Sequence, residues 1–359
     1  MQRDEKIDII KGIAICCVVF GHCDAPFTHF IYLFHMAVFF IASGLVYKWN
    51  YSDSFSGLKT LFLKRVKSLW LPFVGFSTFF LLCWNCLIKL HLYEGNLIAY
   101  SIMLKKFLRL LLFLPTGYPS IPMCGSLWFL FSLFYITMIY GIVDFILKKM
   151  KFSYKRLSHI VFAMIVFLFN YYLIKNGFES KKYTLILGPY IMYALGVDMS
   201  HWNLKSVKEK FFFPIFLSSF FILLLCNGYG SIDIARRIFT SPCFFIAVSI
   251  SGCFFLFSAA YFINKTSFLK KLFTYLGKNT MCIIGLHIFA FKLVSFLQVK
   301  IYSLPIQNLT KSPYLIASSG WWLCYFIVSI SLCLLLNIVY KKIVLSISRL
   351  SCTKLMKLS

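Results

Sequence analysis

Long apolar runs separated by short polar segments dominate this sequence. Each run is close to the ~20 residues that a helix needs to cross the hydrocarbon core of a bilayer. Several runs are short or contain a proline, such as Pro72, Pro189, Pro214 or Pro242, which suits helices packed in a bundle. The pattern therefore predicts an all-α, polytopic integral membrane helix bundle with about ten transmembrane helices. The predicted spans are 7–23, 30–47, 68–90, 126–147, 157–174, 183–200, 211–226, 241–263, 279–299 and 315–340.

The runs follow one another without a gap large enough for a second domain. We therefore expect one transmembrane domain over 1–345, followed by a short cytoplasmic tail over 346–359. The first run contains Asp8 and Lys11 and lacks a small-residue cleavage site, so it is expected to remain as a span. Residues 97–114 mix apolar and basic positions, which predicts either an amphipathic helix on the outer surface or a re-entrant segment.

The composition excludes a water-soluble globule. Of 359 residues, 60% are hydrophobic and only 13% are charged, whereas soluble domains carry about 25% charge. Most of the 13 cysteines lie inside apolar runs, where cysteine behaves as a small apolar residue. No disulfide framework is expected, and spacing alone does not decide whether Cys23 and Cys124, both in predicted outer loops, form a pair.

The net charge of +26 comes from 37 Lys and Arg against 11 Asp and Glu. With a cytoplasmic N-terminus, 24 basic residues fall in inner segments, 11 in outer segments, and Lys11 and Lys292 within spans. Excess positive charge is typical of cytoplasmic loops. We therefore expect a multi-pass protein of the inner, cytoplasmic cell membrane with both termini in the cytoplasm. No nucleic-acid motif accompanies the charge, so the expected partner is the lipid bilayer and not nucleic acid.

Ionisable side chains inside the predicted spans are candidates for function, because lipid tolerates them only when they are paired or line a wet cavity. In the first span, Asp8 and Lys11 are three residues apart, so they face the same side of a helix. Lys11 and His22 are eleven residues apart, which places them on one face with a rise of about 16 Å. This face is either an interfacial charge pair with a separately satisfied histidine, or one wall of a polar passage.

A second histidine, His35, lies in the next span. The connection is short, so the two spans form an antiparallel hairpin with His22 and His35 at comparable depth near the outer leaflet. Two imidazoles can act as a general base and its orienting partner, or they can bind a metal. A metal site needs further ligands, which no nearby motif supplies, so no metal is expected. Ser43-Gly44, later in this span, is typical of close helix packing.

These two spans also carry a resemblance to a known family. The stretch Arg3…Ile7-Asp8-x-x-Lys11-Gly12…Gly21-His22 resembles the start of acyltransferase family 3, whose first-span motif is a basic residue, ten positions and a histidine. Phe34-His35-Met36-x-x-Phe39-Phe40-x-x-Ser43-Gly44 is similar to its second-span signature, with Ala37 where proline is usual. That departure concerns helix shape and not chemistry. Weaker likenesses lie at Lys64-Arg65…Leu71-Pro72, Leu127-Trp128-Phe129-Leu130 and Leu276-Gly277-Lys278-Asn279-Thr280…Leu286-His287.

The resemblance implies a membrane O-acyltransferase, specifically an O-acetyltransferase that uses acyl-CoA to modify a hydroxyl of a cell-surface or lipid-linked glycan. Lysine in the first motif is similar to the fucose 4-O-acetylase-like and enterobacterial-antigen acetyltransferase branch. No permanently bound cofactor is implied, because acetyl-CoA or another acyl-CoA is a co-substrate. The implied partners are acyl-CoA, a glycan or glycolipid acceptor and the bilayer. The alternative is a polysaccharide or lipid-linked sugar transporter or flippase, which would predict internal repeats that the sequence lacks.

The same blocks suggest which residues form the catalytic group. His22 is expected to be the general base or a transient acyl carrier, and His35 to orient it or contact the acceptor. Lys11, held by Asp8, is expected to stabilise charge or to place the donor.

Four further residues are candidates for substrate binding. Each also has a structural interpretation. Arg65 either attracts the donor phosphates or is an ordinary charge of an inner loop. Trp128 either stacks on a sugar or lines the acyl path, or else it anchors the helix at the membrane interface. Asn279 and His287 either belong to the site or make hydrogen bonds between helices.

Overall fold

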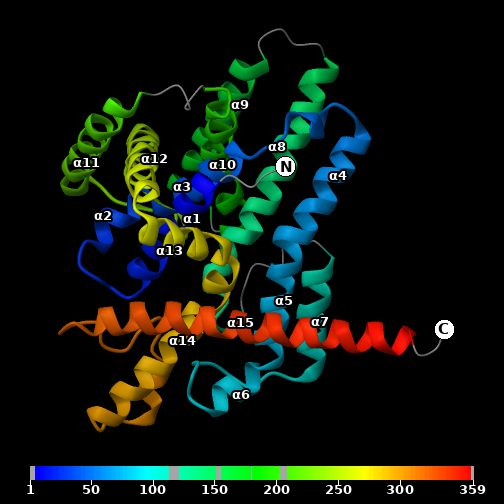
Figure 1. Cartoon of the computed structure of the whole chain (residues 1–359), viewed down its shortest axis with the longest axis vertical. Helices are drawn as coiled ribbons and strands as arrows, with labels where there is room; N and C mark the ends of the chain where they lie inside the picture. The colour runs from blue at the N-terminus through cyan, green and yellow to red at the C-terminus, as the bar shows by residue number, and fades with distance from the viewer. Residues whose placement is uncertain (1–4, 113–120, 151–154, 179, 203–207, 357–359) are drawn as a thin grey trace.

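The computed structural model describes residues 5–112, 121–150, 155–178, 180–202 and 208–356, and this part of the chain is mostly helical (Figure 1). The helices are α1 (Glu5–His22), α2 (Thr28–Tyr32), α3 (His35–Leu45), α4 (Phe55–Arg65), α5 (Leu71–Leu82), α6 (Trp84–Lys89), α7 (Tyr100–Leu111), α8 (Trp128–Lys149), α9 (Lys155–Lys175), α10 (Lys181–Met199), α11 (Phe212–Tyr229), α12 (Pro242–Lys265), α13 (Ser267–Lys278), α14 (Thr280–Ile301) and α15 (Trp321–Met356). Short turns η1 (Trp49–Ser52), η2 (Val66–Trp70), η4 (Gly125–Leu127), η6 (Glu209–Phe211) and η7 (Ile306–Thr310) join some of them. Strands β1 (Ile232–Asp233) and β2 (Ile238–Phe239) pair antiparallel, with Ile232 opposite Phe239.

Helices occupy all ten of the predicted spans. Within the described ranges, seven helical segments are long and apolar enough to cross a membrane. These are Thr28–Leu45, Gly125–Lys149, Arg156–Lys175, Glu209–Tyr229, Pro242–Lys265, Thr280–Ile301 and Trp321–Val344. The all-α, multi-pass membrane bundle is therefore confirmed, whereas the count of ten spans stays a prediction. The sequence predicts a helix within residues 97–114, and the structure has one there, α7, which spans Tyr100–Leu111.

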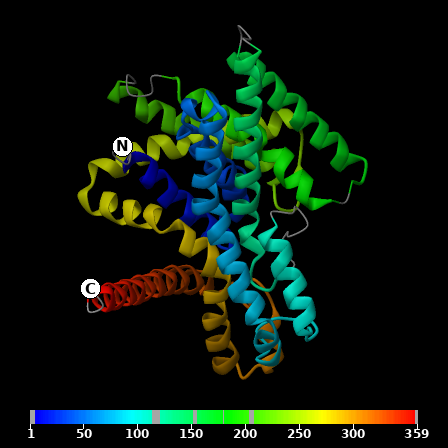
Figure 2. The same ribbon diagram turned by 90° about the vertical axis from the view of Figure 1, so that its right-hand side faces the viewer.

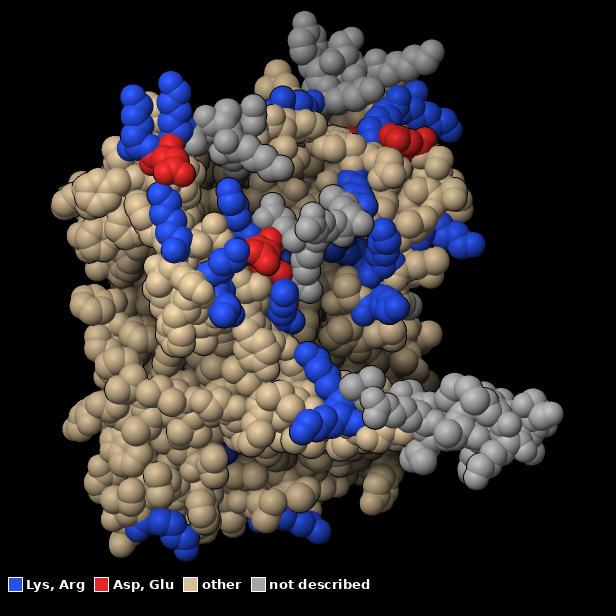
Figure 3. Space-filling view, in the orientation of Figure 1, with Lys and Arg blue, Asp and Glu red and all other residues tan. Residues whose placement is uncertain are grey.

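The helices do not all run in one direction (Figures 1 and 2). Helix α4 continues through η2 into α5, and together they run beside α8. Helix α15 packs on α14 and runs across the direction of α4 and α5 in both views. On the face drawn in Figure 3, Lys and Arg gather over the upper part of the molecule, while the lower part is mostly uncharged except near its edge. Which end faces the cytoplasm stays a prediction.

Glycines let α3 and α10 pack backbone against backbone. A Cβ at Gly44 of α3 would overlap the backbone of Tyr193 and Val197, and one at Gly196 of α10 would overlap the backbone of Ile41. This contact confirms that the Ser43-Gly44 pair serves close packing. It also fixes the helix that carries His35 against the centre of the bundle.

A second glycine pair joins α1 to α13. Gly12 of α1 lies against the backbone of Phe273, and Gly277 of α13 lies against the backbone of Asp8. The N-terminal part of α1 is thereby held in place, and the orientation of α1 determines the position of its last residue, His22.

Buried polar side chains of α14 hold the chain that leads into α15. The Tyr325 hydroxyl donates to Gln298 Oε1 at 2.9 Å and accepts from the Leu315 backbone N–H at 3.0 Å. Gln298 Nε2 donates to the Ile316 carbonyl at 2.7 Å, and Lys292 Nζ donates to the Leu309 carbonyl at 2.6 Å. These buried polar groups therefore find their partners within the chain.

The α3–α10 contact yields a prediction about stability. In Gly44→Ala the new methyl would meet backbone atoms, which cannot rotate away, so the helices must separate at a cost of about 1–3 kcal/mol. Gly75→Ala is the matched control, because a Cβ there meets nothing within 4 Å. We expect a lower thermal midpoint for Gly44→Ala only, measured on detergent-solubilised protein by the loss of its monodisperse gel-filtration peak. Equal midpoints for the two variants would contradict this packing.

Candidate active site

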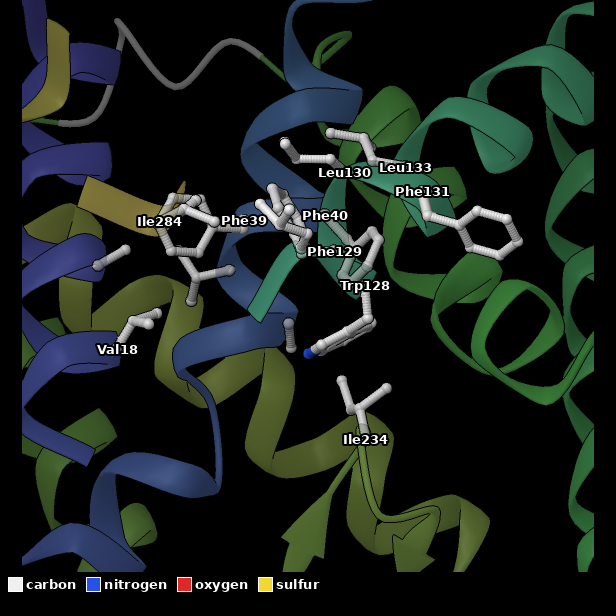
Figure 4. Packing of buried hydrophobic residues seen from close by; sticks show 14 of the residues in the cluster. Val18, Phe39, Phe40, Trp128, Phe129, Leu130, Phe131, Leu133, Ile234 and Ile284 are labelled. Atoms are coloured by element: carbon white, nitrogen blue, oxygen red, sulfur yellow. The ribbon is translucent and has the colours of Figure 1, made fainter. Parts of the chain in front are cut away.

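A small hollow opens where α1, α3, η4, α8 and α14 meet. Its cavity volume is about 20 Å³, enough for one water molecule. Figure 4 shows Val18 and Ile284 facing Phe39, with Trp128 and Phe129 on the opposite wall. The lining residues are Val18, His22, Met36, Phe39, Ser126, Trp128, Phe129 and Ile284. One titratable side chain, His22, thus lies in a mostly apolar hollow, an arrangement typical of small-molecule sites.

His22 and His287 lie side by side. Their ring centroids are 5.2 Å apart, although the residues belong to α1 and α14. His287 is fully buried, and its Nδ1 lies 2.8 Å from the carbonyl oxygen of Ile283. A carbonyl only accepts, so Nδ1 carries the proton and Nε2 of the neutral ring carries the lone pair. That Nε2 is buried and has no hydrogen-bond partner among the described residues.

His35 is locked in the same way, one turn from the end of α2. Its Nδ1 lies 2.9 Å from the carbonyl oxygen of Ile31, so this ring also keeps its lone pair on Nε2. Its closest aromatic contact is Tyr32, with ring centroids 4.8 Å apart, and its charge would act on His22. The sequence predicted His22 and His35 as a pair, and the structure adds His287 as the direct neighbour of His22.

Trp128 is buried in the hollow, with 6% of its surface exposed. It therefore lines the hollow and does not anchor the helix in the membrane interface. Its indole approaches Ile234 from the β1–β2 hairpin (Figure 4), while the Ser126 hydroxyl donates to the Ile284 carbonyl at 2.7 Å. Nearby Cys23 and Cys124 are both free and buried.

The β1–β2 hairpin contributes residues that sequence reasoning missed. The carboxylate of Asp233 accepts a hydrogen bond from the Arg236 backbone N–H at 2.9 Å, and the Arg236 side chain is 3.6 Å away. Burial raises the pKa of the Asp233 carboxyl, while Arg236 acts in the opposite direction. The Arg236 charge also acts on His22. No periodic pattern marks such a hairpin, so only the tertiary structure places it beside the hollow.

Two of the predicted catalytic residues lie at the other end of α1. Asp8 is 2% exposed and packs against Gly277, and Lys11 is half-buried. Eleven residues of helix, a rise of about 16 Å, separate Lys11 from His22. Lys11 is therefore too far away to touch a group that reacts at His22.

Arg65 also lies away from the hollow. It is the last residue of α4, half-buried, and its charge acts on the hydroxyls of Tyr47 and Tyr193. Its Nε is buried without a hydrogen-bond partner in the part of the chain that the structure describes. The structure thus places Arg65 in a second polar region, separate from the histidines.

Asn279 joins α13, α14 and α15. Its Nδ2 donates to the Tyr275 carbonyl at 2.7 Å, and its Oδ1 accepts from Asn337 Nδ2 at 2.6 Å and from Lys341 Nζ at 3.1 Å. Eight residues of α14, about 12 Å, separate it from His287. These bonds favour the helix–helix interpretation of Asn279.

The described ranges contain no group of three His, Cys, Asp or Glu side chains placed to hold one metal ion. The chemistry that these residues offer is proton transfer: His22 faces the hollow, and the imidazole of His287 beside it has a lone pair on Nε2.

Comparison with known proteins gives one match. A family model described as an acyltransferase domain matches residues 4–338. Neither the search of curated proteins nor the search of solved structures found a match.

The hydrogen bonds of Asn279 predict a structural phenotype. Asn279→Ala leaves Asn337 and Lys341 without their acceptor, which should cost about 1–3 kcal/mol of stability. Asn176→Ala is the control, because that exposed amide donates only to the Tyr172 carbonyl of its own helix. We expect a lower thermal midpoint for Asn279→Ala and little change for Asn176→Ala. An unchanged midpoint for Asn279→Ala would show that these hydrogen bonds do not stabilise the fold, and Asn279 would again be a candidate for substrate binding.

Proposed function

The chain belongs to acyltransferase family 3 and is a membrane acyltransferase, and we propose that it is an O-acetyltransferase acting on a hydroxyl of a cell-surface or lipid-linked glycan. The donor is acetyl-CoA, used as a co-substrate. The position of His22 in the hollow, directly beside His287, carries this proposal. A single histidine in an apolar hollow can take a proton from a hydroxyl, and a second one behind it can control which nitrogen does so.

The reaction needs one proton acceptor and no redox chemistry. The acceptor oxygen attacks the thioester carbonyl, forming a C–O bond, and its proton moves to the free nitrogen of His22. When the tetrahedral intermediate collapses, the C–S bond breaks and His22 returns the proton to the departing sulfur. The products are the O-acetyl ester and free CoA. The apolar walls formed by Phe39, Trp128 and Phe129 keep water from competing as the acceptor.

His287 selects the reactive nitrogen of His22. Its Nδ1 is committed to Ile283, so its Nε2 can only accept a hydrogen bond while the ring is neutral. In the reacting complex, Nε2 accepts the N–H on the buried side of His22, which leaves the lone pair of His22 directed into the hollow. Catalytic hydrogen bonds are often longer in the free enzyme than in the complex with substrate. His35 supports the group from α3.

The residues that lie away from the hollow are assigned to binding of the acyl donor. Lys11 and Asp8 lie at the end of α1 opposite His22, and Arg65 lies on α4, also away from the hollow. Cations at these positions can hold the donor phosphates. This assigns Lys11 to donor placement and not to stabilising the oxyanion, because of its separation of about 16 Å from His22. The donor enters from the cytoplasm, and the glycan approaches from the outer side, where the β1–β2 hairpin and Trp128 border the hollow.

The direct test removes His22. His22→Ala should lower acetyl transfer by about 10²–10⁴-fold, the usual contribution of a general base, without loss of the gel-filtration peak. His29→Ala is the control, since His29 is exposed and bonded to Asn227. The assay is mass spectrometry of O-acetyl groups on surface glycans, combined with acetyl-CoA turnover by reconstituted protein. Turnover by His22→Ala at the wild-type rate would rule out His22 as the general base. If deletion of the gene left the O-acetyl groups of the surface glycans unchanged, a transporter would be favoured.

His287 is tested by comparing two replacements. His287→Leu keeps bulk but loses the acceptor, so kcat should fall while KM for the donor stays near the wild-type value. His287→Gln places an oxygen near the position of Nε2 and should restore part of kcat. Steady-state kinetics on both purified variants measure the difference. Equal losses in both variants, or a change confined to KM, would show that His287 does not orient His22.

A further inference from the structure

The hollow beside His22 lies at the N-terminal end of a long helix. The turn η4 continues directly into α8, and Ser126 and Trp128 from this junction line the hollow. No side chain caps the helix at Cys124, the residue before η4. The first N–H groups of a helix have no acceptor within it, and together with the helix dipole they make this end partially positive. The hollow therefore lies where negative charge is favoured.

Trp128, the first residue of α8, directs a hydrogen-bond donor into the hollow. Only 6% of its surface is exposed. In Figure 4 its indole nitrogen, drawn in blue, lies at the edge of the ring nearer to Val18 and away from Phe131. The indole N–H makes no hydrogen bond with any residue in the described ranges. A buried donor without an acceptor is rare, so this N–H is available to a group that enters the hollow with a lone pair.

The faces of the Trp128 ring are not available for stacking. Phe40 and Phe129 pack against the indole, with ring centroids 6.2 and 6.5 Å from it. Ile234 of the β1–β2 hairpin also approaches the ring (Figure 4). A sugar that stacks on an aromatic ring needs one open face. The structure therefore favours a role for Trp128 on the path of the acyl group, through its N–H edge.

Other donors near the hollow are already committed or too far away. Three of the lining side chains can donate a hydrogen bond, namely those of His22, Ser126 and Trp128. The Ser126 hydroxyl donates to the Ile284 carbonyl at 2.7 Å, and His22 is the proposed proton acceptor. Lys11 lies about 16 Å along α1 from His22. The cavity volume of about 20 Å³ suits a single oxygen atom and not a sugar.

We propose that the indole N–H of Trp128, at the positive end of α8, stabilises the negative oxygen that forms on the acetyl group during transfer. When the acceptor oxygen attacks the thioester, a C–O bond forms and the π electrons of the carbonyl move to its oxygen. This oxygen enters the hollow and accepts a hydrogen bond from Trp128. When the carbonyl re-forms, the C–S bond breaks, the sulfur takes the proton from His22, and Trp128 is unchanged.

This inference rests on the proposed function and makes Trp128 a catalytic residue beside His22. The walls of the hollow are mostly apolar, and a hydrogen bond to a charged oxygen is strongest where water is excluded. The uncharged carbonyl of the bound thioester is a weaker acceptor than the oxyanion. The N–H therefore acts mainly on the transition state, and its loss should lower kcat while leaving KM nearly unchanged.

The experiment removes the N–H without changing the shape of the ring. Benzothienylalanine, a tryptophan analogue with sulfur in place of the indole N–H, is placed at position 128 by codon suppression. Loss of one oxyanion donor usually lowers kcat by about 10²–10³-fold, and we expect this loss for the analogue and for Trp128→Phe. The thermal midpoint of the analogue variant should stay at the wild-type value, because the N–H has no partner in the free protein.

The same replacement at Trp321 is the matched control. Its indole N–H donates to the Tyr302 hydroxyl at 2.8 Å, just past the end of α14 and on an exposed part of the protein, so kcat should stay at the wild-type value. Turnover is measured as release of CoA from acetyl-CoA by purified protein reconstituted with glycolipids extracted from its own cells. Calorimetry with CoA gives the Kd of each variant, which should not change at position 128.

The outcomes separate this inference from the proposed function. If wild type releases CoA and the analogue at position 128 works equally fast, Trp128 is not the oxyanion donor, while the acetyltransferase stands. A loss in Trp128→Phe that the analogue does not share would assign the effect to ring size and also overturn the inference. So would a loss explained by a raised Kd or a lower thermal midpoint of the analogue variant. Absence of CoA release by wild type would overturn the proposed function and this inference with it.

Discussion

Every polar atom inside this bundle must find its partner within the protein or in a bound molecule, because lipid offers none. Some buried polar side chains meet this constraint within the chain. Tyr325 and Gln298 bond each other and the chain that leads into α15, and Asn279 bonds Asn337 and Lys341. Other buried polar atoms have no hydrogen-bond partner among the described residues. Nε2 of His287 is one of them, and both polar side-chain atoms of Asn170 and the hydroxyl of Ser249 are others.

Contacts between helices determine where the residues of the candidate site lie. The α3–α10 contact at Gly44 sets the line along which α3 runs from the hollow to Tyr47, and the α1–α13 contact at Gly12 fixes α1. At its C-terminal end α1 presents His22 to the hollow, and α14 brings His287 beside it. His22 and Asp8 thus lie at opposite ends of α1, and Arg65 lies on α4, away from the hollow. In a family of membrane acyltransferases, this separation agrees with a donor and an acceptor that arrive from different sides of the bilayer.

The sequence predicted most of the helices and part of the site. Apolar runs of sufficient length locate the helices, because every segment that crosses lipid needs a long run of apolar residues. The first two motif blocks indicate the family. His22, Trp128 and His287 do gather at the hollow. Their mutual arrangement was not predictable, since periodicity within one span carries no information about a contact between α1 and α14. Asp233 and Arg236 went unnoticed for a related reason: they lie between two predicted spans, and only the folded structure places their hairpin near Trp128.

The most direct test of this account is a cryo-EM structure of the protein with a non-reactive thioether analogue of acetyl-CoA. The account predicts the sulfur in the hollow beside His22 and the phosphates beside Arg65. An analogue bound elsewhere, with the hollow left empty, would contradict it.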